Sequence, residues 1–195
     1  MLPNGNPYLD EFTAAQTDTQ RSVRSFRFGP DGTKAESPDF MTRRELCAKY
    51  AWAVPNEEAL RCLADLSPVI EIGAGTGYWA ALLRKRGAMI HAYDIASIYE
   101  GNPYHPGAQE WLPVLAGGEG VAARYPRDAT LFLCWPTPGL TAACLPGFAG
   151  RHVALIADPA AGADAHEAIR DWQLARTVPI PQWPGFHDEL RIYRR

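Results

Sequence analysis

The sequence predicts an α/β protein with a mostly parallel sheet, on the strength of three observations. Short apolar runs bounded by Pro, Gly or Asp recur along the chain, and such runs are typical of strands buried in a parallel sheet. Segments of helical pattern separate most of these runs, which favours crossover connections between parallel strands. The 195 residues, 47% of them hydrophobic, suit one domain with a sizeable core.

Seven strands are expected, each an apolar run next to a turn signal. They lie at residues 68–75, 88–95, 110–118, 129–136, 152–158, 174–180 and 189–195. Helices are expected at residues 42–52, 57–66, 78–87, 120–126, 139–150 and 162–172. Three helix ends carry local signals, because Thr42 and Asn56 are suitable N-caps and Gly87 is a typical C-terminal stop.

The first 40 residues differ in character from the rest. The stretch FGPDGTKAESPDF, residues 28–40, is rich in turn formers and charge, which indicates a loop or lid and not core. We therefore divide the chain into a flexible N-terminal segment or lid, residues 1–40, and a ligand-binding domain, residues 41–195.

Composition and charge argue against several classes of protein. A net charge of -3 gives no general attraction to nucleic acid or to an acidic membrane surface. No positive segment followed by an apolar core opens the chain, and no apolar run approaches membrane-spanning length. The four cysteines lie far apart with no CxxC pair, so we expect free thiols, no metal site and a cytoplasmic protein.

The stretch VIEIGAGTGYWA, residues 69–80, carries the strongest functional signal. Gly73, Gly75 and Gly77 alternate directly after a buried strand and before a helix. Glycines allow a tight turn and a close approach of a ligand, and the partly positive N-terminus of a helix lies there. The pattern favours a nucleotide-like cofactor loop over an ordinary strand-to-helix turn.

Two residues of this stretch argue against a dinucleotide. The dinucleotide fingerprint G-x-G-x-x-G needs a third glycine where this chain has Tyr78. Glu71, at the end of the strand, would repel a pyrophosphate and suits a ligand that carries a positive group. An NAD-dependent enzyme therefore remains the weaker alternative.

The pattern E-x-G-x-G-x-G resembles motif I of class I S-adenosylmethionine (SAM) dependent methyltransferases. The resemblance implies a Rossmann-like domain, with a mostly parallel seven-stranded sheet whose last strand is antiparallel. It implies SAM as cofactor and S-adenosylhomocysteine (SAH) as product. It assigns Glu71, Gly73, Ala74, Gly75 and Gly77 to the amino-acid part of the cofactor.

A second acidic residue closes the next strand of this family and holds the ribose hydroxyls. Asp94, with Ile95 after it, stands there, 94 − 71 = 23 positions after Glu71. That interval agrees with the general spacing of about 20 residues for a ribose-binding acid. A helix cap or turn residue is the alternative reading of Asp94.

The end of the fourth expected strand bears on the methyl acceptor. Many amino-group methyltransferases carry Asn-Pro-Pro-Tyr there, and this chain has Trp-Pro-Thr-Pro, residues 135–138. Trp135 is predicted to cover the methyl donor or stack on a flat substrate, with Pro136 beside it, although a core tryptophan is an equal reading. The missing Asn weakens the inference of nitrogen methylation.

Further candidates come from two segments around the glycine turn. Tyr50 and Trp52 precede the first strand, where a segment often folds over the cofactor in this family, and hydrophobic packing is the alternative. Residues 97–111 form a polar, aromatic, turn-rich loop in place of an expected helix. Within it, Tyr104 is a candidate substrate contact, and His105 is the candidate general base or else a solvated histidine.

The leading hypothesis is a SAM-dependent methyltransferase that transfers the methyl group in line to a small molecule or a peptide side chain. Nitrogen and oxygen acceptors both remain open. A nucleic-acid methyltransferase is the alternative enzyme. A non-catalytic binding or partner protein with this fold is the alternative from a different class.

Overall fold

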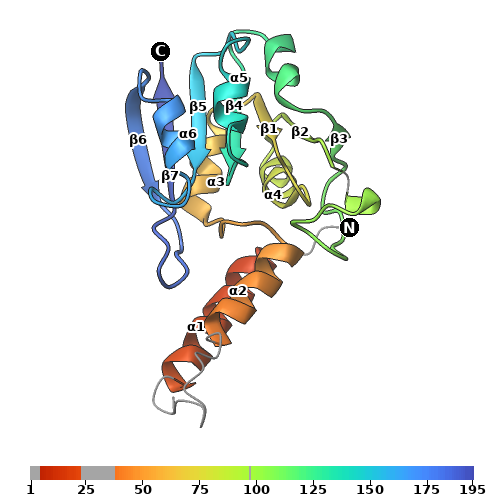
Figure 1. The fold of residues 1–195 in the computed structure, drawn as a ribbon, viewed down its shortest axis with the longest axis vertical. Helices are drawn as coiled ribbons and strands as arrows, with labels where there is room; N and C mark the ends of the chain where they lie inside the picture. The colour runs from red at the N-terminus through yellow and green to blue at the C-terminus, as the bar shows by residue number, and fades with distance from the viewer. Residues whose placement is uncertain (1–4, 23–37, 97) are drawn as a thin grey trace.

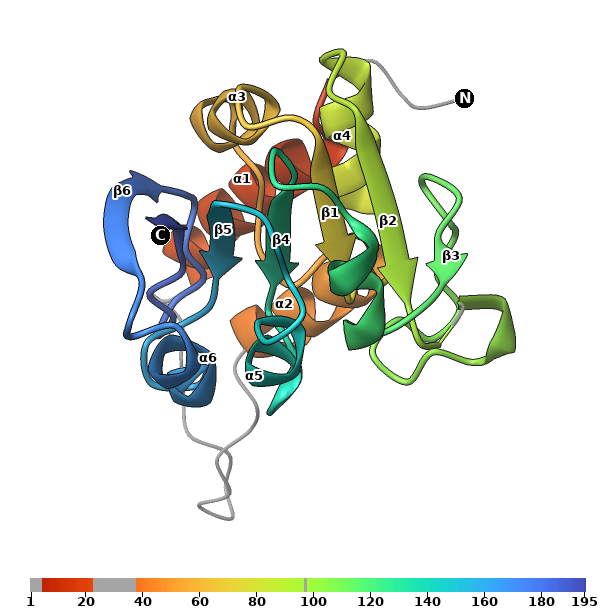
Figure 2. The same ribbon diagram turned by 90° about the horizontal axis from the view of Figure 1, so that it is seen from above.

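A computed structural model of the chain describes residues 5–22, 38–96 and 98–195. Its centre is a seven-stranded sheet with helices on both faces (Figures 1 and 2). The strands are β1 (Val69–Ile72), β2 (Ile90–Asp94), β3 (Leu115–Ala116), β4 (Thr130–Cys134), β5 (His152–Ile156), β6 (Gln173–Pro179) and β7 (Glu189–Arg194). The α-helices are α1 (Pro7–Ser22), α2 (Pro38–Lys49), α3 (Glu57–Ala64), α4 (Tyr78–Lys85), α5 (Leu140–Cys144) and α6 (Ala163–Ala168).

The strand order confirms the predicted fold class. The sheet runs β3-β2-β1-β4-β5-β7-β6. The pairs from β3 through β5 are parallel, whereas β7 is antiparallel to both β5 and β6. The last strand of the chain is therefore the antiparallel one, as expected.

Alternating side chains of β1 build two cores, one on each face of the sheet. Val69 packs with residues of α1, α3 and α4 in one cluster. Ile70 and Ile72 pack in a second cluster with residues of α5, α6 and the 3-10 helix η3 (Glu119–Arg124). Because successive side chains of a strand point to opposite faces, Glu71 lies on the α4 side.

The chain reverses its direction of travel across the sheet at β1. It moves outward through β2 and β3, then crosses back to β4 on the other side of β1. In parallel α/β sheets, ligands bind outside the carboxyl ends of the strands at such a switch point. The ends of β1 and β4 are therefore where a site is expected.

The elements after β2 are shorter than the sequence predicts. The expected strand 110–118 reduces to the two residues of β3, and the helix expected at 120–126 is the 3-10 helix η3. Pro113 precedes β3 and Gly117 follows it, which limits the length that can join a sheet ladder. Asn56 does cap α3, but Thr42 lies inside α2 and not at its start.

Part of the N-terminal segment, residues 1–40, is helical. Residues Pro7–Ser22 form α1, which packs against α2 (Figure 1). Tyr8 and Phe12 are buried in the core beside the sheet, with the Phe12 ring edge-on to Trp183 at 4.8 Å. Most of the loop expected at residues 28–40 lies outside the described residues, and its last three residues, 38–40, begin α2 instead.

No helix in the described ranges is both long enough and apolar enough to span a bilayer.

The burial of α1 predicts that this helix contributes to the stability of the whole domain. Phe12 is 8% exposed, so Phe12→Ala should lower the free energy of unfolding by about 3 kcal/mol through lost burial and the cavity left behind. Chemical denaturation measures this value. Thr13→Ala, at an exposed neighbour on the same helix, is the control and should change it by less than about 0.5 kcal/mol. Equal effects of the two substitutions would show that α1 does not belong to the cooperative unit.

Candidate cofactor and substrate site

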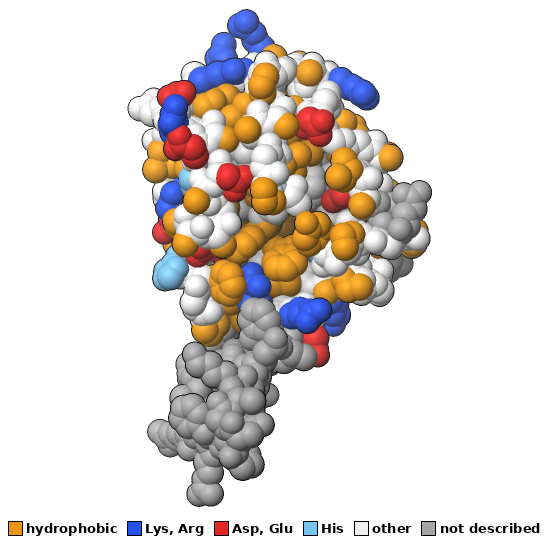
Figure 3. Space-filling view, viewed as in Figure 1, with side chains coloured by type: hydrophobic (Ala, Val, Ile, Leu, Met, Phe, Trp, Pro, Cys, Tyr) orange, Lys and Arg blue, Asp and Glu red, His pale blue; other side chains and the backbone are white. Residues whose placement is uncertain are grey.

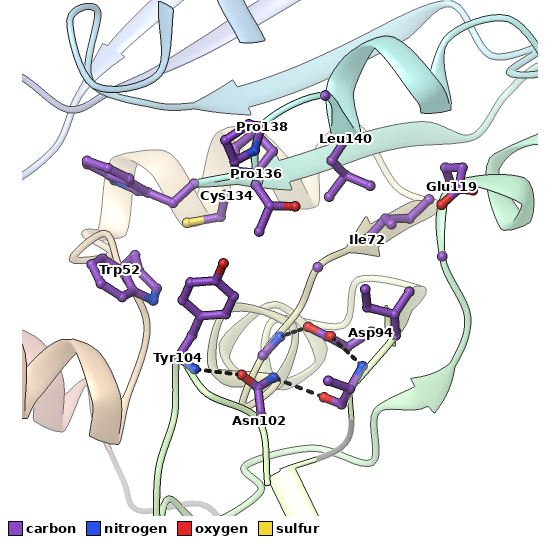
Figure 4. Close-up of a pocket in the computed structure, with 18 of the residues that line it drawn as sticks. Trp52, Ile72, Asp94, Asn102, Tyr104, Glu119, Cys134, Pro136, Pro138 and Leu140 are labelled. Atoms are coloured by element: carbon purple, nitrogen blue, oxygen red, sulfur yellow. Dashed lines mark hydrogen bonds between the residues drawn. The ribbon is translucent and has the colours of Figure 1, made fainter. Parts of the chain in front are cut away.

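A cavity of about 700 Å³ opens at the predicted edge of the sheet (Figure 4). Trp52 and Tyr104 lie toward one end of it, and Asp94, Ile72 and Glu119 lie toward the other. The residues predicted from the sequence that line it are Trp52, Gly73, Gly75, Asp94, Ile95, Tyr104, His105, Trp135 and Pro136. Segments that are far apart in the sequence thus converge on one cavity with a polar end and an aromatic end.

The glycine turn adopts a backbone that other residues rarely adopt. Gly75 and Gly77 have φ values of +54° and +72°. A Cβ atom on Gly77 would lie 2.7 Å from the carbonyl oxygen of Leu112, and one on Gly75 would lie 2.3 Å from Nε2 of His105. Both positions therefore need glycine for conformation and for space. Ala74, between them, is buried and does not line the cavity.

Asp94 joins the end of β2 to the glycine turn. Its Oδ2 accepts a hydrogen bond from the backbone N–H of Gly75 at 2.8 Å, and its Oδ1 accepts one from Ala96 at 3.0 Å. Each carboxylate oxygen retains acceptor capacity toward the cavity that Asp94 lines. Ile95, which follows it, is an exposed part of the same wall.

Glu71 lies behind the cavity wall and not on it. The residue is 2% exposed, and burial raises the pKa of its carboxyl from the ordinary 4.5 to about 8. The N–H of Ala80 in the first turn of α4 opposes this increase in the pKa, while the charge of Asp94 adds to it. Oε2 has no hydrogen-bond partner within the described part of the chain. Glu71 is therefore a neutral acid near pH 7 that becomes anionic easily if a cation approaches.

His105 is buried against the glycine turn and is not a solvated loop histidine. Its Nδ1 lies 3.0 Å from the carbonyl oxygen of Ala48, which can only accept, so Nδ1 carries the proton. Burial lowers the pKa of the imidazole, which keeps it neutral. The remaining Nε2 therefore offers a lone pair on the side of Gly75 and the cavity. Its role as a general base stays a prediction.

The loop around residues 98–111 is held in place by polar contacts that the sequence did not reveal. The buried Asn102 side chain donates to the carbonyl of Ala96 at 2.9 Å and accepts from the N–H of Tyr104 at 3.0 Å. Trp111 donates its backbone N–H to the carbonyl of Thr76 at 2.8 Å. Asn often bonds the backbone N–H two residues later, so Asn102 alone was only a weak signal of this turn.

The aromatic end of the cavity contains two indoles and a phenol. The Trp52 ring lies 6.0 Å from Trp135 and 6.3 Å from Tyr104, centre to centre. Trp135 has a φ of +52°, the only positive value outside glycine in the described segments. A strained backbone of this kind persists where the surroundings impose it and is common at functional sites. Pro136 continues this wall.

The structure contradicts the prediction that Tyr50 lines the site. The structure buries it in the core, stacked on Tyr8 at 5.0 Å and on Trp111 at 5.2 Å, and it does not line the cavity. Its hydroxyl donates to Glu11 of α1 at 2.7 Å. The hydrophobic-packing alternative is therefore the right one for Tyr50, whereas Trp52, two residues later, does reach the cavity.

Several lining residues escaped the sequence analysis. They are Ile72, Ala96, Asn102, Pro103, Gly117, Gly118, Glu119, Cys134, Gly139, Leu140, Ala143 and Ala161, whereas the lining residues Thr137 and Pro138 belong to the Trp-Pro-Thr-Pro stretch already singled out. Most are small or apolar and carry no chemical signal of their own. Among the described residues, no three His, Cys, Asp or Glu side chains gather as a metal site requires.

Among the comparisons with known proteins, the comparison with solved structures bears on the fold. No protein-family model matches the sequence, and no curated protein matches it significantly. Magnesium protoporphyrin IX methyltransferase from Synechocystis PCC 6803, solved with bound SAH, superposes with a TM-score of 0.51 at 13% identity, covering 96% of this chain and 99% of that chain. A TehB-like SAM-dependent methyltransferase from Corynebacterium glutamicum gives 0.49 at 14% identity, covering 84% and 100%. At such identities the likeness is one of architecture, and the chain has the Rossmann-like fold of class I SAM-dependent methyltransferases.

Proposed function

We propose that the protein is a SAM-dependent methyltransferase that acts on a small-molecule acceptor. One observation carries the proposal: the carboxylate at the end of β2 is bonded to the glycine turn at the end of β1, inside a cavity at the switch point of the sheet. The position is the one where parallel α/β sheets bind nucleotide-like ligands.

The residues at the polar end fit SAM better than they fit a dinucleotide. The acceptor atoms of Asp94 suit ribose hydroxyls. The buried Oε2 of Glu71 lacks a partner among the described residues and lies behind the turn, which suits a ligand with positive groups and not a pyrophosphate. SAM would supply a methyl group activated by its bond to a positively charged sulfur.

The chain's own contribution is to align the acceptor and exclude water. The rings of Trp52, Tyr104 and Trp135 form an apolar wall on which a flat acceptor can stack. Alignment within such a site supplies much of the acceleration of a displacement reaction. The neutral His105 holds a lone pair on Nε2 that can take a proton from a hydroxyl or amine acceptor.

The net charge, together with the one face that Figure 3 shows, favours a small acceptor over a nucleic acid. On the face in Figure 3, hydrophobic side chains gather in the lower middle, and acidic side chains are interspersed with basic ones. A nucleic-acid enzyme would present a continuous basic surface along the path of the backbone phosphates. A peptide side chain remains the second acceptor that this cavity would admit.

Asp94→Asn should weaken SAM binding about thirtyfold, because losing a charged hydrogen bond costs roughly 2 kcal/mol. Calorimetric titration with SAM measures the effect. Asp128→Asn, at an exposed aspartate after η3, is the matched control and should leave the affinity unchanged. The same affinity in the Asp94 variant and in the wild type would remove Asp94 from the cofactor site.

Gly75→Ala should weaken SAM binding by about tenfold or more, since the new methyl group collides with His105 and the turn must shift. Gly87→Ala is the control, because Gly87 also has a positive φ of +81° but a Cβ atom added there would meet nothing within 4 Å. Both variants should lose stability from backbone strain, Gly75→Ala the more because of the collision, and only Gly75→Ala should lose affinity. Equal losses of affinity would mean that general destabilisation explains the result.

SAM binding should tighten as the pH rises from 6 to about 8, the pKa of buried Glu71. The ligand's positive charge favours the ionised carboxylate, so binding releases a proton and is assisted by higher pH. Calorimetry in buffers of different ionisation enthalpy counts the protons released. Glu71→Gln cannot ionise and should lose this part of the pH dependence, while any dependence shared by both proteins belongs to the ligand. An unchanged proton count in the variant would contradict the role of Glu71.

A further inference from the structure

A buried guanidinium lies next to the aromatic end of the cavity. Arg43 of α2 is 6% exposed, and its Cζ lies 3.7 Å from the ring centre of Phe186, 5.3 Å from Trp52 and 5.5 Å from Trp135. Cation–π contacts use the face of the guanidinium, whereas its N–H groups point outward in its plane. Nε and Nη2 of Arg43 have no hydrogen-bond partner in the described part of the molecule.

A buried carboxylate whose oxygens accept no hydrogen bond of good geometry from a described residue lies near this guanidinium. Asp188, just before β7, is 1% exposed, and neither of its oxygens accepts a hydrogen bond from a described residue. Burial raises the pKa of Asp188 to about 6, whereas the indole N–H of Trp135 and, to a smaller extent, the positive charge of Arg43 lower it. Trp135 lies close to both, and within the described ranges its Nε1 also lacks a partner of good geometry.

This cluster holds most of the unsatisfied buried polar atoms of the described residues. Arg43, Trp135 and Asp188 contribute five of the eight such atoms. Buried charges are normally paired, since an unpaired one is strongly destabilising. Arg43 and Asp188 are near enough for their charges to interact, and yet they do not bond to each other. The arrangement therefore suits a group that accepts hydrogen bonds from Arg43 and donates them to Asp188.

We propose that Arg43 and Asp188 form a subsite for the zwitterionic headgroup of the methyl acceptor, which is an aromatic α-amino acid. The carboxylate of the headgroup pairs with Arg43, and its ammonium group pairs with Asp188. The ring of the acceptor lies in the cavity against Trp52, Tyr104 and Trp135, which line it. This inference rests on the proposed function, because it identifies the acceptor of that same cavity.

The two indoles control access to the subsite. Arg43 and Asp188 do not line the cavity, whereas Trp52 and Trp135 line it and also contact the Arg43 guanidinium. Both side chains are only partly buried. We therefore expect the headgroup to turn one indole aside on entry, which changes tryptophan fluorescence.

Calorimetric titration of the full chain with three ligands distinguishes the contribution of the headgroup carboxylate from that of its ammonium group. L-phenylalanine has both charges, phenethylamine lacks the carboxylate, and 3-phenylpropionate lacks the ammonium group. Titrations are made with and without SAH. L-phenylalanine should bind, and each analogue should bind about tenfold more weakly or worse, since each leaves one buried charge unpaired. Equal binding of all three ligands, or of none, by a protein that binds SAH overturns the subsite.

Variants locate the effect at the two residues. Arg43→Gln and Asp188→Asn should each weaken L-phenylalanine binding about tenfold and leave the affinity for SAH unchanged. Arg44→Gln, at the exposed neighbour on α2, is the matched control and should change neither affinity. If Arg43→Gln does not fold, Arg43→Lys keeps the charge without the planar fork and should weaken only the ligands that carry a carboxylate. If the wild-type protein does not bind SAH but still binds L-phenylalanine more tightly than either analogue, the proposed function is rejected and the subsite is retained.

Discussion

The hydrogen bond from the N–H of Gly75 to Asp94 is the contact on which the rest of the site depends. It ties the turn after β1 to the end of β2 at 2.8 Å, with Gly75 at a φ of +54°. A turn of this shape leaves room above it for the imidazole of His105 and, behind it, places Glu71 against the first turn of α4. The polar end of the cavity is thus a consequence of one backbone conformation that only glycine adopts without strain.

The aromatic end depends on the N-terminal helices. Tyr78, which follows the glycine turn, donates its hydroxyl hydrogen to Asn6 at 2.8 Å and accepts the N–H of Tyr8 at 3.1 Å. This contact anchors the start of α1 on α4, and α2 packs against α1. Arg43 of α2 contacts the indole of Trp52 and that of Trp135, which directly follows β4. Tyr78, which stands where the dinucleotide fingerprint needs glycine, therefore connects the polar end of the cavity to the helices beside its aromatic end.

Sequence patterns predicted the sheet and the glycine turn because both depend on local chemistry. Alternating glycines after an apolar run, and a carboxylate closing the next strand, determine where the polar end forms. The aromatic end was predicted only in part, since composition does not say which way a ring points: Tyr50 lies in the core and Trp52 in the cavity. The proximity of Arg43 to Asp188 was missed because nothing local connects residues 145 positions apart (188 − 43 = 145) in an ordinary helix and a turn. Tertiary packing alone makes them neighbours.

Calorimetric titration of the wild-type protein with SAH and, separately, with NAD tests the central claim most directly. Both ligands carry adenosine, so the comparison isolates the preference of the turn for an amino-acid group over a pyrophosphate. The junction of Gly75 and Asp94, with Glu71 behind it, predicts micromolar affinity for SAH and no binding of NAD. Binding of NAD in preference to SAH, or of neither ligand, would contradict the assignment of this cavity to SAM.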